Sequence, residues 1–357
     1  NVKNIFIVII LLVFETYFAQ NSSKYSNDFL NIGVDARSTG MANAVVSSTN
    51  DVNSTYWNPS GLINIKNDEI SLMHSNYFAN IANYNYISYA RKIDKESAIG
   101  FSLVRFGVDD IMDTTRLIDN QGNIDFNRIE LFSAADYAFL FSFAKRNKFL
   151  KINYGVNLKI IRRIIGDFAN SWGFGFDFGI QHKNQNGWKF GLMVRDITTT
   201  YNVWSFDQDR LNDIQNAIEG QNQEIPEKNE ISIPKIQIGL SKEINLNGDY
   251  SILAAIDLFL LLEETNDIIS SEYVSINPAI GFEIGYLNLV YLRLGMGNFQ
   301  NEMQFDLSNK LSYQPNFGIG FNLNGFEINY ALTDIGDQSM ALYSNIFSLK
   351  FKPNILR

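Results

Sequence analysis

Few side chains of this sequence are suited to nucleophilic or metal-dependent chemistry. The chain has no cysteine and only two histidines, His74 and His182. The lack of Cys excludes thiol catalysis, disulfides and Cys-ligated metals, and two histidines leave little material for a zinc site. The strand pattern below puts His74 and His182 at opposite ends of the molecule, and neither has an evident nucleophile partner. We therefore expect no catalytic residue and no enzymatic activity.

A bound metal is equally unexpected. Residues 119–125 read Asp-Asn-Gln-Gly-Asn-Ile-Asp, which has the composition of a calcium loop. The segment lacks the ligand spacing of an EF-hand and its terminal Glu. It predicts a turn with solvated carboxylates, and we expect neither a metal nor a cofactor.

A third group of chemically capable side chains lies on one face of the predicted strands. The group contains both signs of charge, so its members can pair with one another. Two interpretations stay open: a salt-bridge network that holds the structure together, which mixed charges favour, or a polar path for a solute. The residues are Lys159, Arg163, Asp177, Arg195, Glu283, Arg293 and Glu327.

The elements that position these charges are β-strands with period-2 alternation. From Trp172 to Ile180 every second residue is large and apolar, and the others are Gly or Asp177. Glycines on the second face suit a crowded or polar lumen, with the aromatic side chains facing lipid. The pattern predicts fourteen strands, each about as long as a tilted transmembrane strand requires. They are 68–77, 82–92, 97–107, 136–145, 150–165, 171–182, 187–199, 233–244, 249–263, 274–286, 289–299, 311–323, 325–334 and 343–352.

The connections between these strands alternate in length. The even-numbered ones are tight turns, for example 93–96, 146–149 and 324–325. The odd-numbered ones include the long segments 108–135 and 201–232. This asymmetry is typical of periplasmic turns and extracellular loops. It predicts an all-β transmembrane antiparallel barrel in a bacterial outer membrane, with periplasmic termini and extracellular long loops.

Composition and the N-terminus agree with that fold. The formal charge of −9 argues against a nucleic-acid partner, and 28 Phe, 17 Tyr and only six Pro suit long strands in lipid. Lys3 followed by the apolar run 5–14 predicts a signal peptide that ends near Ala19. We therefore expect a signal peptide at 1–20, a plug at 21–67 and the barrel at 68–352.

The acidic loop 201–232 is a candidate partner-binding surface. Three of its apolar residues recur at helical spacing, which predicts a short amphipathic helix over the barrel mouth. A partner-binding cap and a plain solvated loop both remain open. The candidate contact residues are Trp204, Phe206, Leu211, Ile214 and Ile218.

Small residues dominate the stretch before the first strand, so its backbone can pack closely inside a lumen. A turn then redirects the chain into that strand. The motif residues are Gly33, Ala36, Arg37, Gly40, Met41, Trp57, Asn58, Pro59, Ser60 and Gly61.

This stretch resembles the N-terminal signature of the PorV/PorQ family, and Arg195-Asp196-Ile197-Thr198 followed by Trp204 resembles the PorV-like branch of that family. These are outer-membrane proteins of the Bacteroidetes type IX secretion system, distantly similar to the FadL fatty-acid channels. The family usually has Asn-Pro-Ala-Gly where this chain has Ser60. The resemblance implies a fourteen-stranded FadL-like barrel with an N-terminal plug. It also implies, as partners, the type IX translocon barrel or attachment-complex proteins and the C-terminal domains of secreted cargo, within outer-membrane lipid.

The resemblance implies two alternative functions. The first is a secretion-system barrel that binds other proteins through its extracellular loops. The second is a FadL-like diffusion channel for hydrophobic small molecules, which predicts an apolar pocket in the lumen and a kinked strand. The long odd-numbered loops favour the first.

Overall fold

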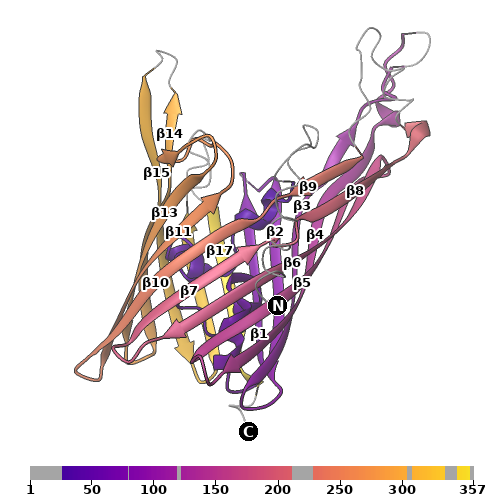
Figure 1. Ribbon diagram of the computed structural model, residues 1–357. Helices are drawn as coiled ribbons and strands as arrows, with labels where there is room; N and C mark the ends of the chain where they lie inside the picture. Colours follow the sequence, from indigo (N-terminus) through magenta and orange to yellow (C-terminus); the bar gives the residue numbers. More distant parts are fainter. Residues whose placement is uncertain are drawn as a thin grey trace, which may run out of the picture.

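A computed structural model of the protein describes residues 26–78, 80–118, 122–210, 228–303, 308–333 and 344–353. These residues form a closed antiparallel barrel that is crossed by fourteen strands (Figure 1). Strand order follows the chain, and β1 closes the barrel by pairing with β17 and with β2. The predicted signal peptide, 1–20, lies outside the described residues. Among the described residues, no helix is both long enough and apolar enough to span a bilayer.

Twelve of the fourteen crossings are single strands, and the remaining two are each built from a pair of strands, β7 with β8 and β9 with β10. The short β12 pairs only with β13. The strands are β1 (Glu69–Tyr77), β2 (Ala82–Lys92), β3 (Ser97–Asp113), β4 (Glu130–Asn147), β5 (Ile152–Ile165), β6 (Ala169–Lys183), β7 (Trp188–Arg195), β8 (Thr200–Phe206), β9 (Asn229–Ser232), β10 (Lys235–Leu246), β11 (Tyr250–Leu261), β12 (Ile269–Ser270), β13 (Ser275–Tyr286), β14 (Val290–Met303), β15 (Asn309–Leu323), β16 (Phe326–Thr333) and β17 (Ser344–Phe351).

Side-chain exposure follows the predicted alternation. In β6 the rings of Trp172, Phe174 and Phe176 are exposed, whereas Gly173 and Asp177 are buried. Aromatic side chains on the outside and small or charged ones inside are the pattern of a barrel in lipid. The six tight turns, of two to four residues each, also lie where the sequence predicted them.

Several strands are longer than predicted. β3 runs to Asp113 and β4 begins at Glu130, so the connection predicted for 108–135 shrinks to 114–129. A bulge at Asp110, whose φ is 60°, breaks the alternation there, and pairing resumes beyond it. The predicted loop 201–232 is likewise wrong at both ends, because β8 and β9 pair within it.

The predicted strand 187–199 is interrupted. β7 ends at Arg195, and β8 begins at Thr200. Between them Asp196 and Thr199 have positive φ values of 54° and 59°. Few non-glycine residues adopt this conformation, so the break requires local support.

Residues 26–67, here called the lumenal segment, lie inside the barrel (Figure 1). The segment contains η1 (Asp28–Asn31), α2 (Ala36–Gly40), α3 (Ser54–Trp57) and η2 (Pro59–Asn64). A further short helix, η3 (Phe126–Arg128), lies in the β3–β4 connection.

Candidate functional site

The lumenal segment folds around two buried aromatic side chains. Tyr56 donates a hydrogen bond to the carbonyl of Leu30, and the Trp57 indole donates to the carbonyl of Val34 at 3.1 Å. From the wall, Tyr84 donates to the carbonyl of Phe29 at 3.1 Å. These bonds join the two ends of the segment and satisfy backbone carbonyls that have no strand partner.

The ten predicted motif residues all lie in this segment, and Asn58 is its central linker. The Asn58 amide donates to the carbonyls of Val46 at 3.0 Å and of Ile180 in β6 at 3.1 Å. Its side-chain oxygen accepts a bond of 2.7 Å from the Ser60 hydroxyl. The Ser that departs from the family's usual Ala therefore orients Asn58.

The inner wall is glycine-lined where the segment passes. A Cβ on Gly155 would lie 2.6 Å from the carbonyl carbon of Pro59, and one on Gly191 would lie 2.5 Å from the carbonyl oxygen of Val46. On the opposite side, a Cβ on Gly281 would lie 2.7 Å from the carbonyl oxygen of Met41. Such distances exclude any larger residue unless the backbone moves. Strands all round the barrel are thus fitted to the segment.

A charged anchor joins α2 to strands β13 and β14. Arg37 donates two hydrogen bonds to Glu283, at 2.8 and 3.0 Å. Glu283 also accepts from Arg293 at 2.6 Å, and Arg293 donates to Asn329 at 2.7 Å. The bidentate geometry is the strongest form of an arginine–carboxylate pair. The predicted pair Glu283 and Arg293 thus meets, and Arg37 completes it.

A second anchor holds the middle of the segment to the last strand. Lys350 in β17 lies 2.7 Å from both Asp51 and Glu327. Of these three residues the sequence analysis placed only Glu327 in the network. Lys350 lies on the same inward face of β17 as Ser344, Ile346 and Ser348. This alternation along the strand could have placed Lys350 in the lumen from the sequence alone.

We expect this second anchor to make the stability of the folded barrel depend on pH. Burial alone would raise the pKa of Asp51, but Lys350 and Arg37 outweigh it and hold the pKa below the ordinary 3.8. A lowered carboxyl pKa gives stability that is present above pH 3.8 and is lost as pH falls through the lowered value. Asp51→Asn should therefore lower stability at neutral pH by about 1.5–3 kcal/mol, the range for a hydrogen bond to a charged group. Its difference from the natural protein should shrink in acid.

Thermal unfolding of the reconstituted barrel between about pH 3 and pH 7 measures this difference. Asp68→Asn is the matched control, since Asp68 pairs with the half-exposed Arg91 at 3.5 Å. A stability difference between Asp51→Asn and the natural protein that grows as the pH falls would contradict the lowered pKa of Asp51.

A third cluster supports the break between β7 and β8. Lys159 lies 3.0 Å from Asp177 and also pairs with Asp196, whose own backbone N–H donates to Asp177 at 2.9 Å. Next to it, the Arg195 guanidinium lies 4.5 Å from the centre of the Tyr56 ring. These contacts hold the positive-φ backbone of Asp196 and bind the break to the lumenal segment.

The last predicted charge, Arg163, lies apart from the others. It contacts Asp136 and Glu230, both at 3.0 Å, and its guanidinium lies 5.0 Å from the Trp204 ring. Trp204 was a candidate partner-binding residue of a loop, but it is a buried residue of β8. Phe206 ends the same strand. Leu211, Ile214 and Ile218 lie outside the described residues.

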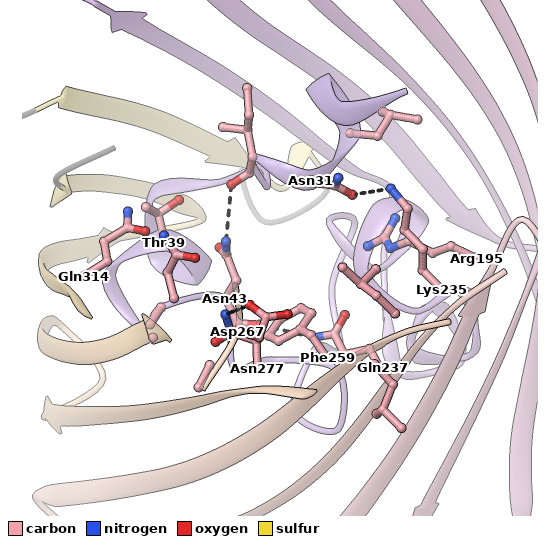
Figure 2. Close-up of a pocket in the computed structure, with 18 of the residues that line it drawn as sticks. Asn31, Thr39, Asn43, Arg195, Lys235, Gln237, Phe259, Asp267, Asn277 and Gln314 are labelled. Atoms are coloured by element: carbon pink, nitrogen blue, oxygen red, sulfur yellow. Dashed lines mark hydrogen bonds between the residues drawn. The ribbon is translucent and has the colours of Figure 1, made fainter. Parts of the chain in front are cut away.

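Two cavities flank the segment, and they share no lining residue. The first, of about 450 Å³, lies on the long-loop side, and Leu30, Ile32, Trp57 and Phe259 contribute apolar surface to it. Figure 2 shows Arg195 and Lys235 at its edge, where Lys235 donates to Asn31 at 2.9 Å. The second cavity, of about 440 Å³, lies on the tight-turn side among the charged anchors. The barrel interior therefore has an apolar pocket on one side of the lumenal segment and a polar pocket on the other.

The two histidines are far from each other. His74 contacts Asn85 at 2.7 Å, and His182 contacts the carbonyl of Lys151 at 2.9 Å beside a tight turn. No group of His, Asp and Glu suited to a metal ion occurs among the described residues. The absence of catalysis stays a prediction.

The barrel is similar to solved transporters of the FadL type. The Pseudomonas putida toluene transporter TodX matches with a TM-score of 0.55 and 12% identity over 90% of this chain and 98% of that chain. The CymD monoaromatic hydrocarbon channel matches with a TM-score of 0.54 and 10% identity over 90% and 97%. A Pseudomonas aeruginosa FadL homologue matches with a TM-score of 0.50 and 12% identity over 89% and 98%. The fold is therefore that of a FadL-like antiparallel β-barrel.

The sequence itself narrows this class. The family model of the type IX secretion system protein PorV matches residues 19–193. The chain is thus PorV-like, which confirms the resemblance of its N-terminal motif. No curated protein sequence matches the chain.

Proposed function

We propose that this protein is an outer-membrane component of the type IX secretion system that binds other proteins through its long loops. The partners would be the translocon barrel or attachment-complex proteins, the C-terminal domains of secreted cargo, or both. The PorV family model supports the secretion system. The bonds between the lumenal segment and the wall support binding over conduction. In this proposal the tight turns and the C-terminus face the periplasm, and the long loops face outward.

The packing of the lumenal segment against opposite walls is the observation that carries the proposal. We infer that residues 21–67 act as a plug, with 68–352 as the barrel and 1–20 as a cleaved signal peptide. In support, the segment bonds to opposite walls through Arg37, Asp51 and Asn58, and the two cavities share no lining residue. Conduction would require several buried ion pairs to break together, which is costly.

The long-loop rim offers a surface for partners. The β3–β4 and β14–β15 hairpins rise above the rest of the barrel (Figure 1). Near the end of the first hairpin Met112, Ile118, Ile124, Phe126 and Leu131 are all more than half exposed. Apolar side chains exposed beyond the lipid belt are a common mark of a protein-binding surface.

The alternative is a channel for hydrophobic small molecules. The apolar cavity and the break between β7 and β8 favour it, since both were predicted for a channel. A volume of about 450 Å³ lies in the range of small-molecule pockets. In this alternative the cavity would retain a lipid or hydrocarbon after purification.

Affinity purification of the tagged protein from native outer membranes distinguishes the two functions. We expect a large translocon barrel, or secreted proteins with C-terminal sorting domains, to be recovered with it. Ile124→Ser with Phe126→Ser should reduce that recovery, whereas the matched Ile81→Ser, on the short β1–β2 loop, should not. Recovery of the barrel alone, with a bound hydrophobic molecule, would favour the channel.

A further inference from the structure

The tight-turn rim carries a concentration of positive charge. Residues 91–97, 145–151, 183–189 and 242–249, here called the basic rim, contain ten Lys and Arg but only four Asp and Glu. The whole chain has a net charge of −9, so this rim has the opposite sign. The two remaining tight turns, 287–289 and 324–325, contain no charged residue. Among the tight turns, the positive charge is therefore concentrated in the four that form the basic rim.

The turns of the basic rim are neighbours in space. The N–H of Arg146 donates to the carbonyl of Glu96 at 2.8 Å, and Lys148 pairs with Glu96. The His182 ring contacts the carbonyl of Lys151 at 2.9 Å, which joins the second turn to the third. Lys189 then reaches Glu243 in β10 at 3.2 Å. The cations thus form one continuous band from β2 to β10.

Lipid-facing rows of side chains end in this band. Phe141 and Phe143 are exposed on the outside of β4, and Lys145 is the next residue on that face. The ammonium of Lys242 lies 5.0 Å from the centre of the outward Trp188 ring. A long cationic side chain at the end of an apolar row, or beside an interfacial Trp, lies at headgroup depth.

The turn tip itself combines apolar and cationic side chains. Phe149 is 93% exposed, and Lys148 and Lys151 flank it. Among the described residues, no ion pair involves Lys95, Lys151 or Lys183. An aromatic side chain between lysines matches the boundary of acyl chains and anionic headgroups better than the surface of an acidic protein.

We propose that the basic rim binds anionic phospholipid headgroups of the leaflet that faces the tight turns. The lysine ammonium groups pair with the phosphates, and Phe149 and Trp188 anchor the turns among the acyl chains. Within the basic rim, Lys92 and Lys189 also reach the lumen, where Lys92 donates to carbonyls of the lumenal segment and Lys189 lines the polar cavity. The proposed site is formed by the cations at the turn tips and on the outer face, and it does not depend on which protein partner the barrel has.

Spin-labelled phosphatidylglycerol in phosphatidylcholine vesicles that contain the full barrel tests this site. Electron paramagnetic resonance should show that the natural protein prefers the labelled anionic lipid over labelled phosphatidylcholine. The preference should fall at least about fivefold in the triple variant Lys145→Gln, Lys151→Gln, Lys183→Gln. Fivefold is about the factor that one lysine contributes at a membrane surface. About 0.5 M salt should weaken the preference of the natural protein as well.

The matched control removes three exposed cations from the opposite rim: Arg128→Gln, Lys228→Gln, Lys310→Gln. It changes the net charge equally and should keep the preference of the natural protein. An equal loss in both variants would mean that only total charge matters, and it would overturn the site. A preference that the rim variant retains in full would also overturn it, and would leave the lysines to an acidic protein domain.

Discussion

Glu283→Gln should lower the free energy of unfolding by about 3–5 kcal/mol, the usual cost of removing one partner from a buried ion pair. Glu283 accepts hydrogen bonds from Arg37 in the lumenal segment and from Arg293 in the wall, and the Arg293 side chain is 1% exposed. A neutral Gln leaves two neighbouring guanidinium groups without their shared carboxylate. Since Gln has nearly the shape of Glu, the loss would come from charge and not from packing.

Urea unfolding of the barrel in lipid vesicles, followed by Trp fluorescence, measures this loss. Glu243→Gln is the matched control, because Glu243 pairs with Lys189 at 3.2 Å while its side chain is 48% exposed. That exposed pair should cost at most about 1 kcal/mol. Equal effects of the two substitutions would show that the charged anchor does not hold the segment.

The barrel could be predicted from the sequence because its period is local. Alternation such as Trp172 to Ile180 fixes which face each residue takes, and tight turns fix which strands are paired. The prediction failed at positions where the two-residue alternation of side chains breaks although strand pairing resumes beyond the break. Asp110, Asp196 and Thr199 take positive φ values that no residue pattern announced, so the break after β7 and the extensions of β3 and β4 were missed.

The sequence predicted which charged residues face the lumen but not which of them pair with one another. The alternation of inward and outward side chains along each strand correctly placed four charged residues inside the barrel, where each is buried: Lys159, Asp177, Glu283 and Arg293. Their partners lie far away along the chain: Arg37 meets Glu283 across 246 residues, and Asp51 meets Lys350 across 299. Contacts over such separations depend on the closed barrel and have no local signature. Trp204 illustrates the converse error, since a residue taken for a loop contact packs against Arg163 within the wall.

The packing of the lumenal segment links these anchors to the proposed function. A channel needs its obstruction to move, whereas a docking platform gains from a rigid interior. Charged pairs, carbonyl bonds to Asn58 and glycines fitted to the segment all favour a fixed interior. The long loops are then the parts of the barrel that are free to meet a partner, in keeping with the proposed role in secretion.

The glycine lining gives the second large expected effect. Gly281→Ala combined with Gly295→Ala should displace the lumenal segment, because the two glycines pair across β13 and β14 and face the same stretch of backbone. A Cβ on Gly281 would lie 2.7 Å from the carbonyl oxygen of Met41, and one on Gly295 would lie 2.5 Å from the carbonyl carbon of Met41. Backbone cannot rotate away as a side chain can, so overpacking at each site should cost about 1–3 kcal/mol or more.

Trypsin reports the displacement directly, because Arg37 is a cleavage site that the folded lumen buries behind Glu283. Cleavage after Arg37 should be slow in the natural barrel and many times faster in the double variant. Both barrels should show the same heat-dependent shift in electrophoretic mobility, which indicates that both are folded. Gly297→Ala is the matched control on the same strand, since the nearest atoms to its Cβ would be the methyl groups of Ala279 and Ala42 at 3.3 Å, with the carbonyl oxygen of Ala42 farther away at 3.7 Å. Protection of Arg37 that survives in the double variant would mean that the segment adjusts within the lumen, and that the glycines do not fix its position.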